Sequence, residues 1–288
     1  MNDHATVQRL PRPDGNTVAY ATTPGRAPTV AFLGGFRSDM TGTKALALEA
    51  WAEKTGRAYL RFDYLGHGQS SGRFEDGTIG RWLDDSLAVI DGLTAGKLVL
   101  VGSSMGGWLS LLVARARPER LAGLVLIAAA PDFTERMLLK GLSTADRATL
   151  ERDGRLERPS QYSPEPSVFT FKLIEEGRNH LLLDKRLSLP CPVRLLHGQS
   201  DPDVPWDYSL QIAAHLEAPE VITTLIKGGD HRLSTPADIA RLIATVEELV
   251  PLSLLNTTSG NIHDEVRRGS ASRQCYRPVE QDEQAARP

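Results

Sequence analysis

The stretch KLVLVGSSMGGW, residues 97–108, decides the fold. Its first part, Lys97–Val101, is mostly aliphatic, which predicts a strand buried on both faces. Gly102-Ser103-Ser104-Met105-Gly106 follows directly, and a helical pattern begins at Met105. A serine on a sharp strand-to-helix turn needs glycines two positions before and two after it, because the turn leaves no room for side chains there. The pattern predicts that Ser104 stands above a sheet as a nucleophile. An ordinary glycine-rich turn with a surface serine is the alternative.

Strand and helix patterns alternate on both sides of this stretch. Such alternation predicts an α/β fold, a mostly parallel, doubly wound sheet with helices on both faces. Before it, Ala5–Leu10 and Thr17–Thr22 predict an antiparallel hairpin. The predicted parallel strands are Thr29–Leu33, Ala58–Phe62, Lys97–Val101, Leu121–Ala129, Pro192–Leu196 and Glu220–Ile226, and the predicted helices are Thr43–Thr55, Thr78–Leu93, Met105–Arg117 and Pro236–Val250.

Residues 131–189 interrupt the alternation between the sixth and seventh strands. The segment reads as helical fragments separated by Gly and Pro, and it is longer than a plain crossover requires. It holds ten acidic and ten basic residues together with many apolar ones. We expect a helical cap over the sheet that suits a lipophilic ligand.

The domain organisation follows from a change of composition near the end of the chain. Residues 1–255 are expected to form one domain that includes the cap. Residues 256–288 are polar and lack periodicity, which predicts a disordered tail.

A serine nucleophile requires a histidine base and a carboxylate that orients this histidine. Asp201 lies just after the predicted strand Pro192–Leu196, and His231 lies just after the strand Glu220–Ile226. This order of serine, acid and histidine fits the nucleophile-elbow pattern. Asp203 remains open as the acid because it shares the loop of Asp201, whereas Asp230 is disfavoured because its neighbour His231 would have to turn back on the local chain.

The developing oxyanion of an acyl-transfer reaction needs hydrogen-bond donors. One candidate is the backbone N–H of Met105, directly after the nucleophile. The second should come from the loop Gly34-Gly35-Phe36 after the strand Thr29–Leu33, and we favour the Phe36 N–H. An ordinary loop turn at Gly34-Gly35 is the alternative.

The remaining motifs predict neither a metal nor a cofactor. His67 and His197 are expected to be structural, and no histidine pair has metal-ligand spacing beside a carboxylate. Gly66-His67-Gly68 lacks the third glycine of a dinucleotide-binding loop, since residue 71 is serine.

Composition and charge indicate which classes of partner and which cellular compartment to expect. Of the 288 residues, 41% are hydrophobic, which is enough to form a sizeable core. The formal net charge is −3, so the chain has no excess of positive charge that would favour binding of nucleic acid. Cys191 and Cys275 are too few for a disulfide framework. The N-terminal residues resemble neither a secretory signal nor a transit peptide, and no apolar run reaches membrane-spanning length. We expect a cytoplasmic protein without stable membrane insertion; the oligomeric state is left open.

Several stretches, spread from about Thr29 to Val250, resemble one family within the α/β hydrolases, the mitochondrial palmitoyl-protein thioesterases that also cleave acyl glucuronides. The stretches are GFRSDMTGTKA (35–45), RFDYLGHG (61–68), GSSMGGW (102–108), PSQYS (159–163), LLHG (195–198) with Asp201, VPW (204–206) and DHR (230–232). The resemblance implies an α/β-hydrolase fold with Ser104 as nucleophile, Asp201 as acid and His231 as base. It also implies activity on S-acyl cysteine and acyl glucuronide esters. The missing transit peptide and the polar tail depart from the family, so its location and protein substrates do not follow.

The combined expectation is a serine hydrolase that cleaves carboxylic ester or thioester bonds through an acyl-enzyme. Its substrate would be a small molecule or an acylated protein with an apolar acyl group. C–C bond or peptide hydrolysis on the same fold is the alternative. Dehalogenase chemistry is disfavoured because Ser104 stands where an aspartate nucleophile would be expected, and the complete triad disfavours a noncatalytic binding scaffold.

Overall fold

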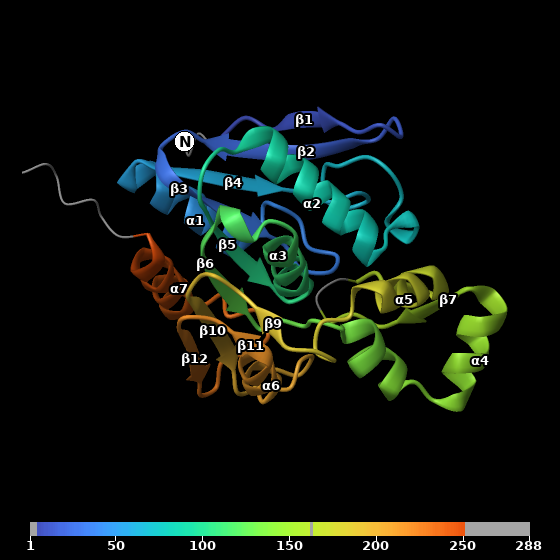
Figure 1. Cartoon of the computed structure of the whole chain (residues 1–288). Helices are drawn as coiled ribbons and strands as arrows, with labels where there is room; N and C mark the ends of the chain where they lie inside the picture. The colour runs from blue at the N-terminus through green and yellow to red at the C-terminus, as the bar shows by residue number, and fades with distance from the viewer. Residues whose placement is uncertain (1–4, 162–163, 251–288) are drawn as a thin grey trace, which may run out of the picture. The chain divides into compact units, whose positions relative to one another are not determined.

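The computed structural model describes residues 5–161 and 164–250, all within one compact unit. Its centre is an eight-stranded sheet in the order β1-β2-β4-β3-β5-β6-β10-β12 (Figure 1). The pairs β1–β2 and β2–β4 are antiparallel, and the other pairs of this sheet are parallel. The strands are β1 Gln8–Pro11, β2 Thr17–Thr23, β3 Arg26–Leu33, β4 Arg57–Phe62, β5 Leu98–Ser103, β6 Leu121–Ile127, β10 Val193–Gly198 and β12 Val221–Ile226.

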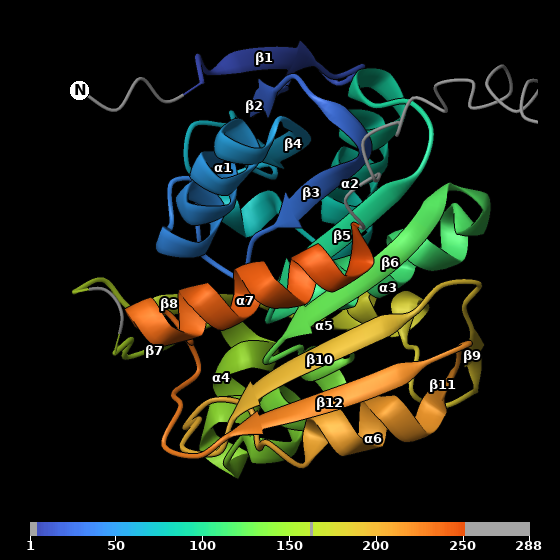
Figure 2. The same cartoon turned by 90° about the vertical axis from the view of Figure 1, so that its left-hand side faces the viewer.

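The helices around this sheet confirm the predicted doubly wound arrangement. Figure 2 shows α1 and α7 across one face, and α2, α3 and α6 cover the other. Their bounds are α1 Thr43–Thr55, α2 Ile79–Leu93, α3 Met105–Ala116, α6 Tyr208–His215 and α7 Pro236–Leu249, with short 3₁₀ turns η1 Phe74–Asp76 and η2 Pro118–Arg120. Helix α6 was not among the predicted helices.

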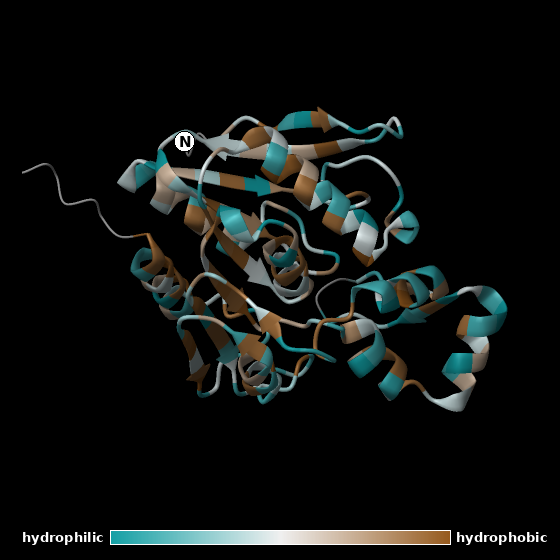
Figure 3. Cartoon of the chain, in the orientation of Figure 1, coloured by the Kyte–Doolittle hydropathy of each residue, from teal (hydrophilic) through white to brown (hydrophobic). Residues whose placement is uncertain are grey.

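Strand β5 shows how the sheet separates two hydrophobic cores. Leu98 and Leu100 pack into the core under α2 and α3, whereas Val99 and Val101 pack into the core under α1 and α7. Successive side chains of a strand point to opposite faces, so a strand covered on both faces must be apolar throughout. Figure 3 shows hydrophobic residues concentrated in the central strands, whereas the outer helices carry hydrophilic residues as well.

The cap lies between β6 and β10, the sixth and seventh strands of the large sheet, as predicted. It also contains a hairpin in which Leu156 pairs with Phe169, so the expectation of helical fragments alone was wrong. The alternating and β-branched residues of the two short strands favour pairing over a helix. The elements are η3 Thr134–Leu138, η4 Leu139–Gly141, α4 Thr144–Asp153, β7 Arg155–Arg158, β8 Ser167–Thr170, α5 Phe171–Gly177, η5 Arg178–His180 and β9 Leu187–Ser188, which pairs with β11 Leu216–Glu217.

Asp132 joins the two ends of the cap. Its buried carboxylate accepts hydrogen bonds from the backbone N–H groups of Leu182 and Leu183, each at 2.8 Å. A buried carboxylate needs such donors because desolvation otherwise makes its charge costly. The contact closes the long insertion at its base.

Two expectations about the chain ends stay predictions. The disordered tail at residues 256–288 lies outside the described residues, and so does the domain boundary at 255. Within 5–161 and 164–250, no helix combines the length and apolarity that crossing a membrane would require.

Candidate active site

Ser104 occupies a strained turn between β5 and α3. Its backbone has φ 55° and ψ −119°, a conformation that residues with side chains rarely adopt. A Cβ atom at Gly102 would overlap the Gly106 carbonyl oxygen, and one at Gly106 would overlap the Leu33 carbonyl oxygen. The two glycines therefore allow the turn to close, as the spacing of the motif predicts. The turn presents a half-buried Ser104 at the carboxyl end of the central strand.

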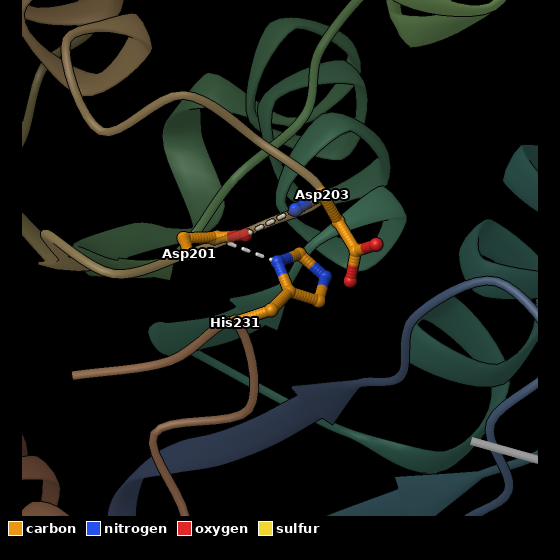
Figure 4. Close-up of side chains that lie close together, drawn as sticks. All are labelled: Asp201, Asp203 and His231. Atoms are coloured by element: carbon orange, nitrogen blue, oxygen red, sulfur yellow. Dashed lines mark hydrogen bonds and ion pairs between the residues drawn. The ribbon is translucent and has the colours of Figure 1, made fainter. Parts of the chain in front are cut away.

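Asp201 and His231 are brought together from the ends of neighbouring strands β10 and β12. His231 Nδ1 lies 2.8 Å from Asp201 Oδ2 (Figure 4). Their loops are joined by the Ser200 N–H, which donates to the Gly229 carbonyl oxygen at 2.9 Å. The structure thus shows the Asp201–His231 half of the predicted triad, and the Ser104–His231 half stays a prediction.

Asp203 lies in the same loop with a different set of contacts. Its backbone N–H donates to Asp201 Oδ1 at 2.8 Å, and the Val204 N–H donates to the same oxygen at 2.9 Å. The Asp203 side chain accepts a hydrogen bond from Gln161 of the cap at 3.0 Å. Asp203 therefore helps to hold Asp201, while Asp201 is the carboxylate bonded to Nδ1 of His231.

One side-chain oxygen from each of Asp201 and Asp203 and one ring nitrogen of His231 lie within 4.8 Å of one another. Carboxylates and imidazole can bind a cation. Both oxygens of Asp201 already accept hydrogen bonds, however, and the Asp201–His231 bond accounts for the grouping without an ion.

His197 makes a contact that sequence reasoning missed. Its Nε2 lies 3.1 Å from Asp201 Oδ2, so two histidines meet one carboxylate oxygen. Burial raises the pKa of Asp201, but the hydrogen bonds from His197 and His231 outweigh this effect and hold the pKa below its ordinary value. Asp201 is therefore ionised whenever the protein is folded near neutral pH.

The loop after β3 passes beside the nucleophile. A Cβ atom built on Gly35 would lie 3.4 Å from the Cβ of Ser104, so the backbone approaches the serine closely. The next N–H belongs to Phe36. Met105 is the first residue of α3, and the first N–H groups of a helix have no partner inside it. Both predicted oxyanion donors thus lie on backbone next to Ser104.

His67 contacts the loop after β3 through the backbone of Arg37. Its ring is buried and packs edge-on against Tyr64, Phe74 and Trp82. Burial lowers the pKa of His67 to about 4, so the ring is neutral at physiological pH. The Nδ1–H donates to the Leu65 carbonyl oxygen at 3.2 Å, which leaves Nε2 to accept the Arg37 N–H at 3.3 Å. His67 is structural, as expected, but it fixes the residue that follows Phe36.

Aromatic side chains connect the cap to the same loop. The Phe36 ring stacks on Phe169 of the cap with centroids 5.0 Å apart and lies 5.8 Å from Phe133. Arg37 reaches the cap through a hydrogen bond of 2.8 Å to the Pro166 carbonyl oxygen. Beside these contacts lies a cleft of about 400 Å³ lined by residues that include Arg37, His67, Phe74, Glu165, Pro166 and Val168. The Phe36 ring also packs edge-on against Phe74, which lines the cleft, so an aromatic cluster borders it.

Comparison with known proteins adds to this geometry. The sequence pattern of the alpha/beta hydrolase family matches residues 30–242. The chain belongs to the α/β hydrolase family. Among curated relatives, the Bos taurus protein named "Palmitoyl-protein thioesterase ABHD10, mitochondrial" is 40% identical over 246 residues, which cover 85% of this chain and 80% of the relative. The Homo sapiens protein of the same name is 41% identical over 243 residues, covering 84% and 79%.

Solved structures of this α/β hydrolase family agree with the fold. A putative hydrolase from Agrobacterium vitis has a TM-score of 0.83 and 41% identity, covering 86% of this chain and 99% of that one. Alpha/beta hydrolase domain-containing protein 10 from mouse has a TM-score of 0.80 and 39% identity, covering 85% and 98%. The resemblance stated from the motifs is confirmed.

The names of the curated relatives bear on the expected location. They describe mitochondrial proteins, which does not match the cytoplasmic location expected from the N-terminal residues. The compartment of this α/β hydrolase therefore stays a prediction.

Proposed function

We propose that this α/β hydrolase is a serine esterase or thioesterase of the palmitoyl-protein thioesterase and acyl-glucuronide esterase type. The observation that carries the proposal is the 2.8 Å hydrogen bond between Asp201 and His231. Both residues follow the carboxyl ends of their strands, the same side of the sheet on which Ser104 lies in its strained turn. A carboxylate fixes the tautomer of the histidine, and the histidine then activates a serine. Relatives of about 40% identity named palmitoyl-protein thioesterase support the substrate class.

In the proposed mechanism, His231 takes the proton of Ser104 as its Oγ attacks the acyl carbonyl carbon. Asp201 stabilises the resulting imidazolium. The N–H groups of Phe36 and Met105 donate to the oxyanion, and His231 returns the proton to the leaving alcohol or thiol. Water, activated by His231 in the same way, then releases the acyl group from Ser104. This chemistry requires no cofactor.

The acyl group is proposed to be apolar. Phe36 packs between residues of the core and of the cap, and this aromatic wall is adjacent to the proposed oxyanion donor. Burying a fatty or aromatic chain there is favourable because apolar surface leaves water.

The test is steady-state hydrolysis of a palmitoyl thioester and an aryl acyl glucuronide by wild type and Ser104→Ala. Activity on either substrate that disappears in the variant supports the serine mechanism, and the ratio of the two rates selects the substrate class. If neither substrate were hydrolysed but a fluorophosphonate still labelled Ser104, the assignment as a serine hydrolase would stand and these two substrate classes would be rejected. If neither substrate were hydrolysed and Ser104 were not labelled, the proposal that the protein is a serine hydrolase would be rejected.

A further inference from the structure

A second histidine contacts the proposed catalytic acid from within the core. His197 lies in β10 and is fully buried, and its Nε2 lies 3.1 Å from Asp201 Oδ2 and 3.0 Å from the Val204 carbonyl oxygen. On the other side of the ring, Nδ1 lies 2.6 Å from the Ser209 hydroxyl of α6. Ser209 is buried as well.

These contacts determine where the proton of the His197 ring lies. The two atoms that face Nε2 are a carboxylate oxygen and a carbonyl oxygen, and neither can donate. Nε2 therefore carries the proton and shares it between them. On the other side of the ring, the hydrogen bond between Nδ1 and the Ser209 hydroxyl holds the ring in this orientation. The ring is thereby fixed as a hydrogen-bond donor aimed at Asp201.

The His197 hydrogen bond matters because it is made to the same Asp201 oxygen that bonds to His231. Asp201 Oδ2 accepts from His197 and from His231, whereas Oδ1 accepts the backbone N–H groups of Asp203 and Val204. A hydrogen bond to a carboxylate oxygen draws charge from it and weakens its attraction for a second donor. His197 therefore limits how strongly Asp201 stabilises the imidazolium form of His231.

We propose that His197, oriented by Ser209, is a positioning residue that holds the catalytic carboxylate of Asp201 and sets the pH at which the base His231 becomes active. The proposal rests on the proposed function, since it assigns a role to a partner of the acid. His197 acts only through Asp201.

Other charged groups also lie around His231. They are Asp201 and Asp203 on the acid loop, Asp230 and Arg232 on its own loop, and Lys44 of α1, which donates to the Arg232 carbonyl oxygen. The Gln161 amide of the cap, which reaches Asp203, is neutral. None of these residues changes in the variants below, so their influence is common to all profiles.

The test compares pH profiles of kcat/KM for wild type, His197→Leu and His197→Gln on the substrate that the Ser104→Ala experiment selects. His197→Leu removes the Nε2–H donor to Asp201, so Asp201 should stabilise the imidazolium form of His231 more strongly. We therefore expect the acid limb of the profile, where kcat/KM falls as the pH is lowered, to move to higher pH by about one unit with KM unchanged. His197→Gln can place an amide N–H near the position of Nε2, and we expect its acid limb to return towards the wild-type position.

Ser209→Ala keeps the inference testable if His197→Leu does not fold. Loss of the hydroxyl frees the ring to rotate, so we expect a smaller shift in the same direction. Ser86→Ala is the matched control, because Ser86 is also a buried helical serine, but its hydroxyl bonds to the Trp82 carbonyl oxygen of its own helix. Its acid limb should coincide with that of wild type.

The outcomes separate the two proposals. Lower kcat without movement of the acid limb in His197→Leu or Ser209→Ala would show a merely structural role and overturn this inference alone. Movement of the limb to lower pH would overturn it as well. If Ser104→Ala retained wild-type activity, the proposed function would fail, and the role of His197 with it.

Discussion

At the scale of single residues, the glycines of the elbow have measurable consequences. A methyl group at Gly102 would overlap the Gly106 carbonyl oxygen and the Ser110 hydroxyl, so the turn must shift. We expect Gly102→Ala to lower the free energy of unfolding by about 1–3 kcal/mol and kcat/KM about a hundredfold. Urea unfolding and steady-state kinetics measure the two effects.

Gly92 provides the control for this substitution. It is exposed in α2, and a Cβ atom there has no neighbour within 4 Å. Gly92→Ala should stabilise the fold by up to about 1 kcal/mol and leave kcat/KM unchanged. Equal effects at both glycines would contradict the steric explanation.

His67 predicts a dependence of stability on pH. Its pKa falls from an ordinary value of 6.5 to about 4 in the folded protein, so between these values the unfolded chain binds more protons. The free energy of unfolding should therefore decrease as the pH falls from about 6.5 to about 4, by up to about 3 kcal/mol from this group, and show no such contribution above pH 6.5.

The measurement is the difference between wild type and His67→Gln in urea unfolding at several pH values. Buried carboxylates such as Asp63 and Asp85 titrate in both proteins, so their contributions cancel in the difference. A difference that stays constant from pH 4 to 7 would rule out the buried neutral imidazole.

The site shows what the sequence reveals at the residue scale and what it does not. The order of Ser104, Asp201 and His231, each after a strand, selected them as candidates and left Asp203 open as the acid. Asp201 and Asp203 could not be separated, because the answer depends on how one loop folds back onto the carboxylate. The contact of His197 with Asp201 depends on the same fold of the loop, and no pattern in the sequence encodes it.

At the scale of elements, the cap depends on its closure by Asp132. Replacement of Asp132 by Ala leaves the N–H groups of Leu182 and Leu183 without their acceptors and places alanine at φ 59°. We expect a loss of about 2–3 kcal/mol of unfolding free energy and faster hydrogen exchange in residues 134–180 than in the central sheet.

Asp132→Asn is the matched control for the cap. Asparagine keeps one acceptor oxygen and tolerates positive φ, so the variant should lie between wild type and Asp132→Ala. Exchange that accelerates equally in cap and sheet would show that Asp132 supports the whole domain and not the cap.

Elements differ in how well the sequence predicts them. The central strands of the large sheet are covered by helices, and their continuous aliphatic runs identify them; even so, β6 ends two residues early, at Ile127, because Ala128 takes a positive φ. The hairpin β7–β8 and helix α6 were not predicted. Their segments are short. In the hairpin, Leu156 packs against other cap residues and Phe169 stacks on Phe36, so contacts with distant parts of the chain decide its conformation.

At the scale of the whole molecule, the junction of cap and core predicts a substrate preference. Phe36 contacts Phe74 of the core and Phe133 and Phe169 of the cap, and this apolar cluster lies beside the proposed oxyanion donor. We expect kcat/KM to be higher for octanoyl and longer esters than for acetyl and butyryl esters, about tenfold or more, because each buried methylene contributes about 0.8 kcal/mol.

A series of esters with one leaving group and increasing acyl length measures this preference. Phe169→Ala should flatten the dependence on length, while Phe169→Leu, which keeps an apolar side chain, should retain most of it. Acetyl esters as the best substrates would contradict the lipophilic site.

The position of His231 after the last strand of the large sheet also determines when, during synthesis, the proposed active site becomes complete. His231 follows β12, which lies at the edge of the sheet and is the last of its strands to leave the ribosome. A nascent chain that ends before this strand holds the serine turn and the acid loop but no base. In the proposed mechanism it cannot hydrolyse acyl groups, so catalysis begins only when translation of the domain is nearly complete.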